Sequence, residues 1–228
     1  MRAIILTGML FAGCLRGFSQ QPVAVVGTTP QEVKKPDTSS SIVYKSDLDF
    51  TYTYSVDWEV LDTEPMMPVA RMQGEDKAES DPEKRAAQCV QIGLMLKRGT
   101  PSSVIIALSL PWDCLGKSYK TSDLPAFGGG VAKGILRSYD AKEPVYGAYK
   151  LGAHDFWIER TVGAGKDHPE NVRTLEIACV LLKKGALCMM GLLKDDVDLN
   201  AFESATLSIE GDAPAQLVPA NVFASHSK

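Results

Sequence analysis

Histidine is scarce in this chain: three histidines occur among 228 residues, and His226 lies close to the C-terminus. Only His154 and His168 therefore remain for metal binding or acid–base catalysis, and a metal site usually needs three or four converging ligands. The sequence also contains no G-x-S-x-G nucleophile elbow, no P-loop and no G-x-G-x-x-G dinucleotide fingerprint. None of the cysteines stands in a C-x-x-C pair, which leaves thioredoxin-like and zinc-ribbon sites without support. We therefore expect a protein that binds no cofactor.

Positive charge and long apolar runs are also in short supply. Lys and Arg number 24 against 28 Asp and Glu, a formal net charge of −4. This balance argues against a general nucleic-acid binder, which needs a basic face to displace counterions. After residue 19, no apolar run approaches the roughly 20 residues that a membrane-spanning helix needs, so we expect no transmembrane segment. Apolar residues at 45% and charged residues at 23% are ordinary for soluble globular proteins.

The first 19 residues have the pattern of an export signal. Arg2 is followed by an uncharged, mostly apolar stretch over residues 3–15, and Gly17 and Ser19 then place small residues before a cut at Gln20. This pattern predicts a cleaved signal peptide and an exported protein, either periplasmic or secreted. An alternative is that residues 11–14 (FAGC), which resemble the lipobox of bacterial lipoproteins, make Cys14 the site of a lipid anchor.

The other four cysteines fit an oxidising compartment. They allow three pairings, and the sequence alone does not choose among them. Cys179 and Cys188 flank the turn-like residues 183–185 and could meet across a hairpin, which would leave Cys89 to pair with Cys114. A shift of the hairpin register would instead place Cys179 and Cys188 on opposite faces, and buried free thiols are a further alternative.

Composition divides the chain into four parts. After the signal peptide (1–19), residues 20–45 are rich in Pro, Thr, Ser and Gln and are predicted to form a flexible linker. Residues 46–219 are predicted to form a single domain, and residues 220–228 a loose tail.

Alternation of apolar and polar residues predicts most of the strands. Residues 49–61 indicate two short strands, and residues 102–110 a buried strand. Two hairpins are expected from four further strand-like runs, at residues 145–151, 156–162, 175–182 and 186–193.

Capping signals predict the helices. The clearest helix is expected from Asp81, with Pro82 at its first position, to Gly99. A second is expected from Ser122 to Leu136, with the glycines at 128–130 indicating close backbone packing or a loose helix start in preference to a phosphate loop. Asp198 is expected to cap a last helix, and residues 64–78 are expected to form a loop.

Hairpins outnumber crossovers in this order, so the predicted class is α+β, a largely antiparallel sheet with helices packed on it. The order of elements resembles the PsbP/Mog1 superfamily through the aromatic residues 50–54 leading to Trp58, the meander of residues 146–193 and the closing residues 199–203. The resemblance implies a PsbP/Mog1-like fold and, because members mostly act as binding or accessory proteins, a non-enzymatic role. The run 151–160 is also similar to uncharacterised exported proteins of environmental bacteria.

The best polar constellation consists of His154, Asp155 and Glu159. Along a strand, Asp155 and Glu159 share one face, and His154 at the turn could join them as a metal ligand or an acid–base partner. A metal-assisted hydrolase using these three residues is thus one hypothesis, against the simpler one in which they close a hairpin and face solvent.

Together these patterns predict an exported, non-catalytic binding or accessory protein of the bacterial cell envelope. Its partner would be another protein or an envelope ligand. The alternatives are the hydrolase and a lipid-anchored envelope protein attached through Cys14.

Overall fold

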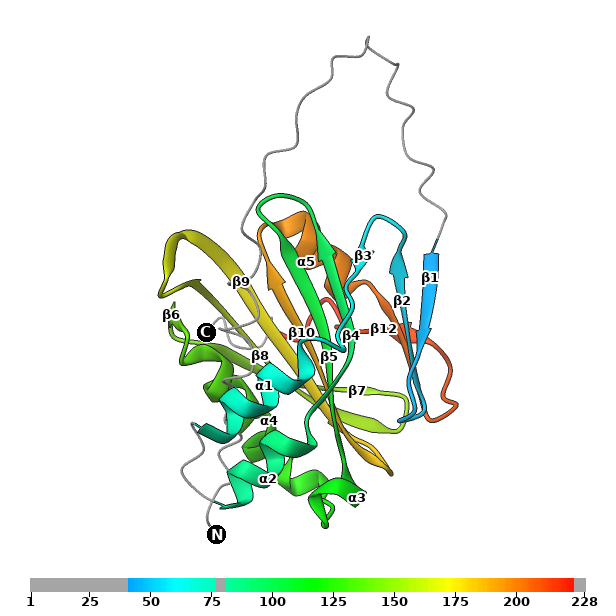
Figure 1. Ribbon diagram of the computed structural model, residues 1–228. Helices are drawn as coiled ribbons and strands as arrows, with labels where there is room; N and C mark the ends of the chain where they lie inside the picture. The colour runs from blue at the N-terminus through cyan, green and yellow to red at the C-terminus, as the bar shows by residue number, and fades with distance from the viewer. Residues whose placement is uncertain (1–40, 77–80, 224–228) are drawn as a thin grey trace.

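The computed structural model describes residues 41–76 and 81–223 of the chain (Figure 1). The predicted signal peptide, Cys14 and most of the predicted linker lie outside these residues. Two sheets and a group of helices form three layers, with the larger sheet in the middle.

The larger sheet has eight strands, and every strand pair in the described part of the chain is antiparallel. Its order is β3(Glu59–Val60), β4(Gln91–Arg98), β5(Ser103–Pro111), β10(Gly185–Leu193), β9(His168–Leu181), β8(His154–Gly165) and β6(Tyr139–Ala141), and β7(Val145–Leu151) also pairs with β8. The smaller sheet has the order β1(Ser41–Lys45), β2(Phe50–Ser55), β11(Thr206–Ile209) and β12(Ala215–Gln216). The predicted α+β class is confirmed.

The helices divide between the two faces of the larger sheet. One face carries α1(Met67–Asp76), α2(Asp81–Cys89), α3(Trp112–Leu115), the 3-10 helix η2(Thr121–Asp123) and α4(Leu124–Leu136). The other face packs against the smaller sheet and against Phe202 of α5(Asp196–Glu203). We call these the helix-facing and the sheet-facing sides.

Strand β10 lies at the centre of the larger sheet and is buried on both sides. Cys188, Met190 and Leu192 belong to the helix-facing core, and Leu187 and Met189 to the sheet-facing core. A strand covered on both faces needs a continuous apolar run, which is what residues 185–193 supply. The four runs expected as two hairpins form β7 to β10, and both hairpins are present.

The long helix expected from Asp81 to Gly99 is wrong in its second half, because α2 ends at Cys89 and residues 91–98 form β4. The register between β4 and β5 shifts between Ile92 and Leu94, a β-bulge that adds one residue. The bulge leaves Ile92 and Met95 on the helix-facing side with Leu94 and Leu96 opposite. The bulge interrupts the alternation of apolar and polar residues in β4. The apolar residues of this strand therefore fall at intervals that resemble those of a helix.

Other boundaries differ from expectation. The expected loop at 64–78 contains α1, with Pro68 in its first turn, where no intrahelical N–H is needed. The last helix is capped by Asp195, whose carboxylate accepts the backbone N–H of Asp198 at 2.9 Å, so Asp198 lies inside the helix. Strand β1 occupies the last five residues of the expected linker, and Val222, in the expected tail, is buried.

Glycine allows helix α4 to approach β8 closely. A Cβ at Gly128 would lie 2.2 Å from Cε3 of Trp157, so only a residue without a side chain fits there. This contact agrees with the expectation of close backbone packing at residues 128–130.

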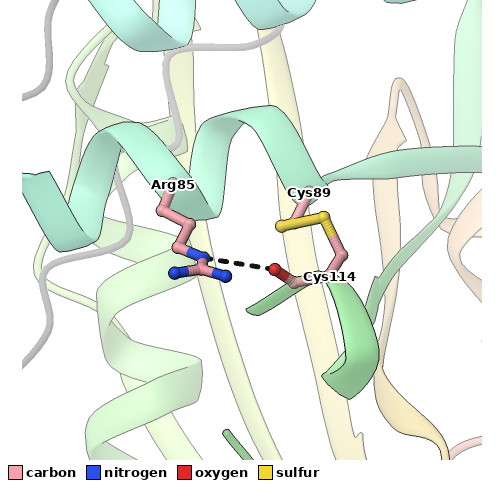
Figure 2. Close-up of a disulfide and its surroundings, with 3 residues drawn as sticks. All are labelled: Arg85, Cys89 and Cys114. Atoms are coloured by element: carbon pink, nitrogen blue, oxygen red, sulfur yellow. Dashed lines mark hydrogen bonds between the residues drawn. A yellow bond between two sulfur atoms is a disulfide. The ribbon is translucent and has the colours of Figure 1, made fainter. Parts of the chain in front are cut away.

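Both disulfides join the cysteines that were expected to pair if Cys179 and Cys188 meet across a hairpin. Cys89 at the end of α2 is bonded to Cys114 of α3, and Arg85 of α2 donates from Nε to the Cys114 carbonyl at 3.2 Å (Figure 2). Cys179 and Cys188 stand directly opposite each other on β9 and β10 and form the second bridge. Cys89, Cys179 and Cys188 are buried, and Cys114 is exposed.

Candidate functional site

The three residues of the hydrolase hypothesis do not meet in one site. His154 lies on the side of β8 that Phe156 and Ile158 share, which faces the smaller sheet, whereas Asp155 and Glu159 lie on the side of Trp157. His154 instead approaches the C-terminal part of the chain, with Nε2 3.7 Å from Asp212 and 3.9 Å from Glu210. Strand alternation therefore separates the imidazole from the two carboxylates that were expected to act with it.

Asp155 and Glu159 also differ in environment. Asp155 is partly exposed and pairs with Lys150 at 3.0 Å, as expected for a residue near a hairpin end. Glu159 is only 4% exposed, so the expectation of a solvated carboxylate is wrong, and burial raises its pKa to about 7. Across residues 41–76 and 81–223, no three His, Cys, Asp or Glu side chains are grouped so that they could hold a metal ion.

A cavity of about 230 Å³ opens on the helix-facing side of the larger sheet. Its lining comes from both ends of the β8–β9 turn and from the β4–β5 turn region, together with Tyr139 of β6. These two hairpins extend past α1, α2 and α4 at one end of the larger sheet (Figure 1). The described residues that line it are Leu61, Met95, Lys97, Ser102, Val104, Tyr139, Gly165, His168, Asn171, Arg173 and Leu192.

Strand register builds the apolar floor of this cavity. Lys97 of β4 stands opposite Val104 of β5, and Val104 stands opposite Leu192 of β10. Met95 lies two residues from Lys97 on the same side, and Met95, Val104 and Leu192 are almost fully buried. Their side chains form a continuous apolar surface at the base of the cavity.

Glycine leaves the space above this floor open. Gly165, at the end of β8, lines the cavity, and a Cβ placed there would find no heavy atom within 4 Å. A larger side chain at this position would therefore enter free space without meeting the backbone of a neighbouring strand.

Arg173 is a partly buried cation in the lining of the cavity. It shares the helix-facing side of β9 with Leu175 and Ile177, where alternation places core residues. Burial lowers the pKa of its guanidinium, and the Coulomb effects of Tyr139 and Asp198 oppose that shift. Within the described part of the chain no carboxylate forms an ion pair with Arg173, and none of the residues lining the cavity is acidic.

The rim of the cavity supplies further polar groups. Lys97, Asn171 and Ser102 line it, and burial raises the pKa of Tyr139, so its phenol keeps its proton at neutral pH. His168, also at the rim, is exposed, with Nδ1 3.4 Å from Glu170. This set can hold an anion by charge and hydrogen bonds while the floor contacts apolar atoms.

A second hollow, of about 450 Å³, lies at the opposite end of β4 and β5. Its two lysines are already neutralised, because Lys183 pairs with Glu210 at 3.1 Å and Lys184 with Asp49 at 2.7 Å. Asp47 and Asp113 also line it. Its lysines are therefore paired within the protein, whereas Arg173 forms no ion pair with a described carboxylate.

From the sequence, His168 is one of two histidines left for metal binding or acid–base catalysis, and Arg173 is not among the expected site residues. A signal was present, because residues 173, 175, 177 and 179 read Arg-Leu-Ile-Cys, a cation at a position that alternation assigns to the core. The alternating pattern does not reveal the cavity that lies beside Arg173 in the folded chain.

The chain is thus an antiparallel α+β protein with a cationic cavity over an apolar floor. No family model matches it, and no curated protein matches it. Among solved structures, it is similar to the solution structure of cyanobacterial PsbP (CyanoP) from Synechocystis sp. PCC 6803, with 11% sequence identity and a TM-score of 0.41 over 78% of this chain and 98% of that chain. No helix of the described ranges is long and apolar enough to cross a membrane.

Proposed function

We propose that this protein is an exported, non-catalytic binding protein of the bacterial cell envelope whose ligand occupies the cavity beside Arg173. The observation that carries the proposal is a partly buried guanidinium that forms no ion pair within the described chain and stands over an apolar floor. Burying a charge is unfavourable unless a partner compensates it. A bound ligand would supply that partner, and concave sites with an apolar lining and a few polar groups are typical of small-molecule binding.

Two features support export. The Cys89–Cys114 and Cys179–Cys188 bridges fit an oxidising compartment, where disulfides form and persist. The N-terminal sequence carries a short cationic start, an apolar stretch and small residues before Gln20.

Export is tested by producing the full chain with a C-terminal tag in a bacterium and fractionating the cells. We expect the protein in the periplasm or medium, with a mature chain that mass spectrometry shows to begin at Gln20. A Cys14→Ser variant should be processed in the same way. An acylated Cys14, with processing lost in the variant, would instead support the lipid-anchored alternative, and an unprocessed cytoplasmic chain would contradict export.

Binding in the cavity is tested with the variant Gly165→Leu. We expect ligand-observed NMR to detect binding of small amphipathic probes, hexanoate and hexan-1-ol among them, to the mature protein. The variant should weaken binding at least about tenfold, because the leucine fills space that the ligand needs. The matched control is Val172→Leu, which adds one methylene at an exposed residue of the same hairpin and should leave binding unchanged. Absence of binding by any probe, or equal binding by both variants, would contradict the proposed site.

A further inference from the structure

We infer that the cavity selects a small organic carboxylate: an acid group bound at Arg173 and carried on one short chain or one ring that lies on the apolar floor. This inference rests on the proposed function and specifies the ligand class of the same site.

The charge of the ligand follows from the lining. Arg173 carries positive charge, and none of the described lining residues carries negative charge. A neutral ligand would leave the partly dehydrated Arg173 guanidinium with only the Coulomb effects of Asp198 and Tyr139, whereas a bound anion would form an ion pair with it. The planar fork of a guanidinium matches the two oxygens of a carboxylate and binds them in parallel.

Hydrogen-bond donors beside Arg173 fit the same group. The Tyr139 phenol and the Asn171 amide both line the cavity; the phenol can donate to a carboxylate oxygen, and so can the second N–H of the amide, whose Nδ2 also donates to Glu170 at 2.9 Å. Because burial raises the pKa of Tyr139, this phenol stays a donor at neutral pH and does not become a competing anion.

The floor excludes a wholly polar anion. Met95, Val104 and Leu192 would face the oxygens of a bound phosphate or sulfate with hydrocarbon, and these oxygens would lose hydrogen bonds to water without replacement. The ligand must therefore present apolar atoms on the side away from Arg173.

The volume limits the apolar part. The cavity measures about 230 Å³, below the roughly 300–1,000 Å³ of sites that enclose drug-sized molecules. A six-carbon acid or the terminal residue of a peptide is of suitable size. Both sources present the same chemistry, a carboxylate beside a short hydrocarbon.

The test is isothermal titration of the mature protein with five probes, namely hexanoate, hexan-1-ol, N-acetyl-leucine, N-acetyl-leucinamide and inorganic phosphate. We expect hexanoate to bind at least about tenfold more tightly than hexan-1-ol, in line with the strength of charge-assisted hydrogen bonds, and phosphate not to bind. Preference for N-acetyl-leucine over both its amide and hexanoate would identify a peptide C-terminus as the source, and the reverse order a free acid.

Variants of Arg173 test whether this residue causes the preference for hexanoate over hexan-1-ol. Arg173→Met should lower hexanoate affinity about tenfold or more and leave hexan-1-ol affinity unchanged, which also shows that the cavity remains folded. Arg173→Lys should lose an intermediate amount, because an ammonium is a point charge without the planar fork. Lys166→Met, an exposed cation on the same hairpin outside the lining, is the control and should bind like the parent protein.

The failures of the two proposals are distinguishable. Equal binding of hexanoate and hexan-1-ol, or tight binding of phosphate, would overturn the carboxylate class while Gly165→Leu still reports on the cavity. If Arg173→Met lowers the affinity for hexanoate and for hexan-1-ol by the same factor, the carboxylate class is also overturned. If no probe binds, both the class and the proposed site fail.

Discussion

Replacing Arg160 with methionine is expected to lower the free energy of unfolding by about 3–5 kcal/mol at pH 8, because it leaves a buried carboxylate without its partner. Arg160 of β8 donates from Nε to Glu176 of β9 at 2.5 Å, and it also pairs with Glu203 of α5. Glu176 is completely buried, and its second oxygen, Oε1, has no hydrogen-bond partner in the described structure. The guanidinium, which also lies over the Phe223 ring, is thus the main compensation for this charge.

The loss should depend on pH. Burial raises the pKa of Glu176 to about 7 against the opposing effect of Arg160, whereas a glutamate in an unfolded chain titrates near 4.3. The folded protein therefore holds this proton more tightly, and the stability that it contributes is present at low pH and disappears as pH rises through about 7. Without Arg160 the pKa of Glu176 rises further, so the deficit of the variant should be small at pH 5 and largest at pH 8.

Urea denaturation of the mature protein at both pH values measures this effect. The double variant Arg160→Met/Glu176→Gln should recover most of the loss at pH 8, since no buried charge remains. Lys150→Met is the control, because its ion pair with Asp155 is exposed and should contribute less than about 1 kcal/mol. Equal losses at pH 5 and pH 8, or no recovery in the double variant, would contradict this account.

Replacing Asp198 with alanine is expected to cost about 2–4 kcal/mol of unfolding free energy. The Asp198 carboxylate, 2% exposed, accepts hydrogen bonds from the Arg98 guanidinium and the Ser103 hydroxyl. The Ser103 oxygen in turn accepts the backbone N–H of Lys194 at 2.9 Å. Alanine would leave the buried Ser103 donor unpaired, while Arg98 would keep Asp57 at 2.7 Å and its contact with the Trp58 ring. The retained contacts are the reason to expect a smaller loss than for Arg160.

Two variants of α5 test this assignment by thermal and urea unfolding. Asp196→Ala is the control, because Asp196 is exposed in the first turn of the same helix and should contribute no more than about 1 kcal/mol through the helix dipole. Asp198→Asn keeps an acceptor and should fall between alanine and the parent protein. If Asp198→Ala and Asp196→Ala lose equal amounts, the network does not hold α5 against the sheet.

The strands that could be predicted are those with a regular apolar pattern that also pair with the next or preceding strand in the sequence. Residues 145–193 alternate or run apolar between recognisable turns, and each of β7 to β10 pairs with a neighbour in sequence, so short-range information was sufficient. Strand β4 was mispredicted because the bulge between Ile92 and Leu94 disturbs the alternation. The placement of β10 between β5 and β9 joins segments far apart in sequence, and no local pattern encodes it.

Sequence by itself determined the chemical inventory: few histidines, no catalytic motif, four cysteines able to pair, an N-terminal export pattern and an antiparallel α+β class. Tertiary structure alone decided that His154 faces away from Asp155 and Glu159, that Glu159 is buried, and that a hollow remains beside Arg173. The reason is that alternation specifies only the side of a sheet on which a residue lies. Whether that side is covered by a helix, paired with a charge or left open depends on segments that meet only when the chain folds.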